Sequence, residues 1–162
     1  MFMACTESIP TISPVECNVV QESPFDIWYL DSGCSNYMTR NIELFSSLDK
    51  SVQTKVTLGT HIQVTVLGKG SINILTKQGE KKIMPDVYYV FGLKHNLMSI
   101  GHLLHKGYII YMEDNHYVIM DRYPSNQRIG RIQMTSNKMF PLTLKPTKKK
   151  NAMLVVGKQK YV

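Results

Sequence analysis

The chain has 162 residues, 43% of them hydrophobic, which suits one ordinary domain and excludes two independent lobes. Six lysines and no acidic residue lie in residues 145–162, so most of the formal net charge of +7 belongs to the C-terminal end. No run of about 18 apolar residues exists, and the first ten residues lack the basic-then-apolar order of a signal peptide. We therefore expect an intracellular, cytoplasmic protein without a membrane segment.

The cysteines and histidines indicate neither a disulfide framework nor a metal site. Cys5, Cys17 and Cys34 are odd in number and have no zinc-binding spacing. His102 and His105 have a metal-compatible i, i+3 spacing, but no cysteine or third histidine lies nearby in the sequence. We expect reduced cysteines, no metal and no cofactor.

Three segments of different character follow each other along the chain. Residues 1–25 contain three prolines and no sustained hydrophobic period, which is typical of a disordered linker. Residues 26–144 carry short runs rich in Val, Ile, Tyr and Thr, bounded by Gly, Asn or Asp. Residues 145–162 open with a proline and a lysine run, which predicts a basic tail or linker.

The short runs predict a body made mainly of antiparallel β-strands, and their close spacing favours a closed sheet or barrel. Turn-forming residues at 77–80 and 113–115 predict two hairpins, and residues 59–61 suggest a third. The expected strands are residues 27–30, 52–58, 62–67, 71–76, 81–90, 108–112, 117–120, 129–134 and 139–144.

One short helix is expected after Ser99. Ser99 is a typical N-cap residue, Ile100, Leu103 and Leu104 lie on one face, and Gly107 follows at the position that favours a left-handed backbone. A helix of about seven residues is not stable alone, so we expect it to pack against the sheet.

The most informative local sequence is an apolar strand that runs directly into Asp31-Ser32-Gly33. It delivers a carboxylate at a strand end, where glycine permits a tight turn. Aspartic proteases use two carboxylates that share one proton: one activates a water, and the other donates a proton to the peptide carbonyl. Because the chain holds one such motif, a homodimer would have to bring two copies of Asp31 together. Asp-Ser-Gly alone is also a common turn sequence.

Further stretches accompany this motif in a fixed order and spacing over residues 26–144. They are Trp28 to Thr39, Phe45, Val56 to Gly59, Gly68 to Gly70, Asp86 to Leu93, Asn96 to Leu104 and Met139 to Leu142. Together they resemble the protease of copia-type LTR-retrotransposon Pol polyproteins, whose usual motif is Trp-x-x-Asp-Ser-Gly-Ala-Ser-x-His-Met-Thr.

The resemblance implies a retropepsin-like closed β-barrel with one short helix, in a domain that spans residues 26–144. It implies an aspartic endopeptidase that cuts peptide bonds in the Gag-Pol polyprotein of its own retroelement and works as a homodimer. Asp31 carries over as the catalytic residue, with Ser32 and Gly33 as its loop. Since the usual flanking zinc segments are missing, we expect a fragment of a longer polyprotein.

Two structural details also follow from the resemblance. A retropepsin closes a glycine-bearing hairpin, the flap, over its substrate, and the candidate here is the segment 58–71 with Gly59, Gly68 and Gly70. Residues 96–99 would form the strand that passes behind the active loop.

Three residues depart from the family pattern: Cys34 replaces Ala, Tyr37 replaces His, and Phe91 replaces Pro. They leave open a second hypothesis, in which the chain is a catalytically inactive β-barrel that serves as a spacer or interaction module. Cys34 beside Asp31 also raises the question of a thiol nucleophile, but no histidine lies close in sequence, which favours a packing role.

The lysine run of the tail supports a third hypothesis, a weak contact with nucleic acid. Lys148, Lys149 and Lys150 could bind phosphates without sequence specificity through counterion release. A solvated linker is the simpler explanation of the same residues.

Overall fold

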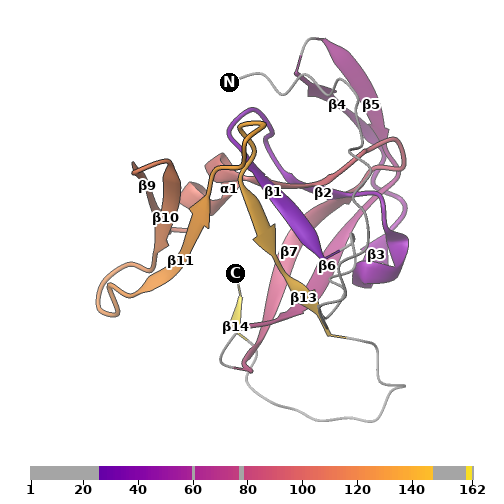
Figure 1. Ribbon diagram of the computed structural model, residues 1–162. Coiled ribbons are helices and arrows are strands. Elements are labelled where there is room, and N and C mark those ends of the chain that lie inside the picture. The colour runs from indigo at the N-terminus through magenta and orange to yellow at the C-terminus, as the bar shows by residue number, and fades with distance from the viewer. Residues whose placement is uncertain (1–25, 60, 77–78, 148–159, 162) are drawn as a thin grey trace, which may run out of the picture.

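The structure, a computed structural model, describes residues 26–59, 61–76 and 79–147, together with the backbone of residues 160–161. This part of the chain is mainly β with one short α-helix, as the sequence predicts (Figure 1). Neither of its helical segments has the length and apolar composition that a membrane crossing needs. Its elements are β1 (Ile27–Asp31), β2 (Tyr37–Thr39), the 3₁₀ turn η1 (Ile42–Leu44), β3 (Phe45–Asp49), β4 (Thr54–Leu58), β5 (Ile62–Val66), β6 (Gly68–Leu75), β7 (Lys81–Tyr89), β8 (Asn96–Ser99), α1 (Ile100–His105), β9 (Ile109–Glu113), β10 (His116–Met120), β11 (Arg128–Gln133), β12 (Pro141–Thr143), β13 (Lys145–Pro146) and β14 (Lys160–Tyr161).

The largest sheet has the strand order β12-β1-β8-β2-β7-β6-β13, with β3 added on β6 and β14 added on β7. Most of its neighbours are antiparallel, as expected, but β1 with β8, β2 with β7, and β14 with β7 are parallel. Parallel neighbours need long connections, which is why these pairs join segments far apart in the chain.

The two ends of this strand order are almost continuous in the chain. β12 pairs with β1 and β13 pairs with β6, and Leu144 alone separates the two short strands. Strand pairing therefore continues beyond residue 144, where the sequence predicts that the tail begins.

All three expected hairpins form, and residues with a positive φ lie at their turns. Gly79 has a φ of 80° between β6 and β7, and Asp114 and Asn115 have values of 47° and 61° between β9 and β10. Gly59 and His61, between β4 and β5, also have positive φ values. The β4–β5 hairpin forms a sheet of its own, and β9, β10 and β11 form a third, away from that hairpin (Figure 1).

Strand β1 packs against hydrophobic clusters on both faces. Trp28 and Leu30 are 2% and 4% exposed and belong to the larger hydrophobic cluster, together with residues of β6, β7, β10 and β11. Tyr29 points the other way and packs against a second cluster that includes Cys34 and Leu97. The strand that ends at Asp31 is thus held from both sides.

Helix α1 begins and ends at the residues that the sequence predicts. The Ser99 side chain accepts a hydrogen bond from the His102 N–H, and Gly107 follows the helix with a φ of 97°. The predicted apolar face is only partly buried, because Leu103 is 3% exposed but Leu104 is 47% exposed.

An ion-pair cluster at Asp86 joins the C-terminal end of α1 to the main sheet. The Asp86 carboxylate lies 3.1 Å from Lys69 Nζ and 3.6 Å from Lys106 Nζ. Partial burial acts to raise the pKa of Asp86, but the hydrogen bond from Lys69 and the charges of Lys69 and Lys106 outweigh it and lower the pKa.

We expect Asp86→Asn to lower the free energy of unfolding at neutral pH by about 0.5–1 kcal/mol, because the ion pairs are partly exposed. Because the pKa of Asp86 is lower in the folded than in the unfolded protein, its ionised carboxylate stabilises the fold. This stabilisation is fully present at pH values above the unfolded-state pKa of 3.8, and it is lost as the pH falls through the folded-state pKa. Urea unfolding of wild type and Asp86→Asn should therefore show a difference in the free energy of unfolding at about pH 7, and this difference should shrink toward about pH 3. Asp86 has a φ of 61°, so Asp114→Asn, at another left-handed position, is the control. A pH-independent difference for Asp86→Asn would contradict the expectation.

Gly70 is required by a close approach of backbone. A Cβ at this position would overlap the Ser47 carbonyl oxygen and lie 2.9 Å from Leu48 Cα, both in β3. Gly70→Ala should therefore destabilise the fold by about 1–3 kcal/mol, since backbone must move. Gly92→Ala is the control, because a Cβ there meets nothing within 4 Å. Thermal unfolding measures both, and equal melting temperatures would refute the packing role of Gly70.

Candidate active site

The predicted catalytic residue Asp31 is the last residue of β1, at the point where the strand enters a tight loop. Its side chain is half-buried, whereas Ser32 and Gly33 are exposed. The Gly33 N–H donates a hydrogen bond of 2.7 Å to Asp31 Oδ1. The structure therefore brings the three predicted residues together and fixes one oxygen of a solvent-accessible carboxylate.

The loop after Asp31 is attached to the strand beside it. Asp31 lies opposite Ser99 in the parallel register of β1 and β8. The Ser99 hydroxyl donates a hydrogen bond of 2.7 Å to the Cys34 carbonyl oxygen, and Cys34 Sγ lies 3.6 Å from the Asp31 carbonyl oxygen. Residues 96–99, which the resemblance places behind the loop, thus form a strand that pairs with β1 and is bonded to the loop through Ser99.

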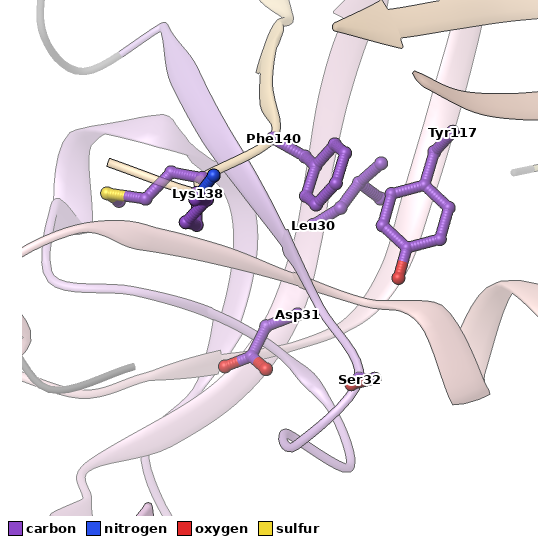
Figure 2. A pocket seen from close by; sticks show the side chains of 7 residues that line it. Leu30, Asp31, Ser32, Tyr117, Lys138 and Phe140 are labelled. Carbon is purple, nitrogen blue, oxygen red and sulfur yellow. The ribbon is translucent and has the colours of Figure 1, made fainter. Parts of the chain in front are cut away.

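A small pocket adjoins the carboxylate (Figure 2). The rings of Tyr117 and Phe140, with centroids 4.4 Å apart, lie next to Leu30 on its apolar side. The pocket is lined by Leu30, Asp31, Ser32, Tyr117, Lys138, Met139 and Phe140. Sequence patterns did not predict Tyr117 or Lys138 as site residues, because a tyrosine in a strand and a lysine in a turn carry no specific signal.

Lys138 is held in a turn whose backbone is unusual for a lysine. Its φ is 65°, and its N–H donates a hydrogen bond of 3.0 Å to the Thr135 carbonyl oxygen. The Thr135 N–H in turn donates to the Met139 carbonyl oxygen at 2.8 Å. The turn thereby fixes one wall of the pocket.

The three glycines expected in a flap lie in two different elements. Gly59 is in the turn of the β4–β5 hairpin, with a φ of 50°. Gly68 and Gly70 lie in β6 of the main sheet, opposite Tyr89 and Val87. Their lack of a side chain serves the approach of β3, whereas Gly59 serves a turn.

The Cys34 side chain is 4% exposed in the second hydrophobic cluster. Burial, and secondly the negative charge of Asp31, raises the pKa of the Cys34 thiol to about 12. Such a thiol is almost entirely protonated at neutral pH, so it is unsuited to act as a nucleophile.

We expect Cys34 to resist modification in the folded protein. In a variant with Cys5→Ser and Cys17→Ser, a thiol reagent at about pH 8 should label the native protein very slowly and the guanidinium-unfolded protein at once. Fast labelling of the native protein would contradict the buried position of Cys34.

The His102 side chain takes part in packing. Its ring lies against the Tyr37 ring with centroids 4.4 Å apart, and burial, followed by the charge of Lys106, lowers the pKa of His102. Among the residues that the structure describes, no group of three or more His, Cys, Asp or Glu side chains could hold a metal ion.

Several predicted features lie outside the described residues. They are the N-terminal segment 1–25 with Cys5 and Cys17, and the basic residues Lys148, Lys149 and Lys150.

Comparison with known proteins assigns the chain to a protein family. The Pol polyprotein beta-barrel domain family matches residues 28–108, which is half of the chain and includes the Asp31 loop, the β4–β5 hairpin and α1. A transposon Ty5-1 protein of Saccharomyces cerevisiae is 33% identical over 73 residues, or 45% of this chain and 47% of that protein. The match spans about half the length of this relative. No solved structure matches significantly. The chain therefore belongs to the Pol polyprotein beta-barrel domain family.

Proposed function

We propose that this domain is the aspartic endopeptidase of a copia-type retrotransposon, that it cuts peptide bonds in the polyprotein, and that it works as a homodimer. The observation that carries the proposal is the Asp31 carboxylate, which stands at a strand end with one oxygen held by the Gly33 N–H at 2.7 Å. The family and the transposon relative support an origin in a Pol polyprotein. The pocket beside Asp31 supplies apolar surface for a substrate side chain.

The chemistry needs Asp31 from two subunits. Two carboxylates in close contact share one proton, because like charges at short distance cannot both ionise. The ionised Asp31 takes a proton from a water that attacks the scissile carbonyl carbon, and the protonated Asp31 of the second subunit donates its proton to the carbonyl oxygen. Ser32 and Gly33 keep the loop small, so that two loops can approach each other.

Within this proposal, the β4–β5 hairpin with Gly59 is the flap. Val56, Leu58 and Val64 of the hairpin pack against the hydrophobic cluster that contains Cys34. One face of the hairpin is therefore in contact with the cluster that supports the catalytic loop, while Gly59 and His61 are exposed at its tip.

We further propose that the main sheet closes into a barrel. The supporting observation is the segment from β12 to β13, which pairs first with β1 and then with β6. A strand that changes partner in this way joins the two ends of the strand order.

The protease proposal predicts that Asp31→Asn lowers kcat/KM by about 10²–10⁴-fold, since it removes the general acid–base pair. The assay is cleavage of peptides from the flanking polyprotein at about pH 5, with and without pepstatin. Asp49→Asn is the matched control, because Asp49 is an exposed acid in β3, outside the candidate site. Equal cleavage by wild type and Asp31→Asn would refute the role of Asp31, and no cleavage by wild type would favour an inactive interaction module.

The dimer makes a separate prediction about mixtures. Adding folded Asp31→Asn protein to a fixed amount of wild type should lower cleavage, because mixed dimers hold only one intact carboxylate. Sedimentation equilibrium over the same concentrations should show that activity follows the dimer fraction. Activity in a strictly monomeric protein would contradict the shared site.

A further inference from the structure

We infer that the hydroxyl of Ser99 is a positioning group for the candidate catalytic loop, an inference that rests on the proposed function. Ser99 is fully buried at 0% exposure and lies directly opposite Asp31 in the register of β1 and β8. Its hydroxyl contacts the loop rather than the carboxylate, so it acts through the loop backbone.

The two hydrogen bonds of Ser99 define the direction of its hydroxyl. The oxygen accepts the His102 N–H at 3.0 Å, and its single proton goes to the Cys34 carbonyl oxygen at 2.7 Å. The bond to Cys34 is buried and the bond from His102 is partly buried, and an unmade hydrogen bond costs more in such an environment than at the surface. The loop is therefore tied to the first turn of α1.

The geometry links this tie to the carboxylate. Asp31 is fixed at one end of the loop by its pairing with β8, and Cys34 is fixed at the other end by Ser99. Gly33 lies between these two fixed points, and its N–H holds Asp31 Oδ1. If the Ser99 hydroxyl is lost, the Cys34 end of the loop is released, and Gly33 loses the constraint that aims its N–H.

The helix that carries this tie is itself held in place. At its C-terminal end Lys106 contacts the Asp86 carboxylate, and along its length the His102 ring packs on Tyr37. The loop is thus held by a packed helix and sheet. Such rigid support suits a catalytic carboxylate, which must be positioned to a fraction of an ångström.

We expect Ser99→Ala to lower kcat about 10–100-fold with little change in KM, because a misplaced carboxylate harms the reaction more than peptide binding. Ser99→Thr, which keeps the hydroxyl and is also a good N-cap residue, should restore most of kcat. Ile100→Ala is the matched control, since it removes packing at the neighbouring residue and leaves both hydrogen bonds of Ser99 intact. Melting temperatures of all three variants show whether a loss of kcat exceeds what reduced stability alone brings.

A second measurement does not depend on catalysis. Hydrogen exchange of the Gly33 amide and the ¹³C shift of the Cys34 carbonyl, followed by NMR, should change in Ser99→Ala and stay as in wild type in Ile100→Ala. Unchanged signals in Ser99→Ala, or an equal loss of kcat in Ile100→Ala, would overturn the inference. If wild type cleaves no peptide, the proposed function fails, and the NMR signals alone decide whether Ser99 orders this loop.

Discussion

The parallel pairing of β1 with β8 is the constraint on which the rest of the site depends. It joins segments that are 68 residues apart in the chain, from Trp28 opposite Asn96 to Asp31 opposite Ser99. Buried polar residues lie at both ends of β8. Asn96 donates to the Ile27 carbonyl oxygen at 3.1 Å and accepts from the Thr39 hydroxyl at 2.6 Å. Since buried hydrogen bonds are costly to leave unmade, these contacts specify one register for the strand that delivers Asp31.

Hydrophobic packing reinforces this register. Because Trp28 and Leu30 face one cluster and Tyr29 faces the other, a slip of one residue would exchange the two faces of β1. The same alternation explains why the strand carries aliphatic or aromatic residues at four successive positions, as strands packed on both faces do. The carboxylate follows directly after this apolar run, so the packing of its neighbours and its pairing with β8 set its position, and the Gly33 N–H orients one of its oxygens.

Local signals predicted the hairpins and the helix well, because turns and caps depend on nearby residues. Gly79 and Asn115 tolerate a positive φ, and Ser99 and Gly107 mark the ends of α1. Strands β2 and β3 escaped prediction from periodicity, since β2 has three residues that are all buried and β3 carries exposed serines. A short strand without alternation takes its structure from its neighbours.

The limits of sequence reasoning are clearest at the glycines and in the pocket. Gly59 and Gly70 look alike in the sequence, but one serves a turn and the other the close approach of β3, which only the pairing of β3 with β6 reveals. Tyr117 and Lys138 meet Leu30 and Asp31 through tertiary structure, so neither residue could be assigned to the site from its own neighbours in the chain.

Two of the three departures from the family pattern concern packing rather than the carboxylate, whereas the third, Phe91, is exposed. Cys34 lies in the cluster behind the loop, and Tyr37 is fully buried against His102. Neither side chain contacts the oxygen of Asp31 that Gly33 holds, so these substitutions leave the half-site intact. One carboxylate cannot both activate a water and protonate the carbonyl oxygen. Under the proposed function, the step from this fold to hydrolysis is therefore the meeting of two Asp31 loops, and a substitution that prevents their approach would abolish cleavage as fully as the loss of Asp31 itself.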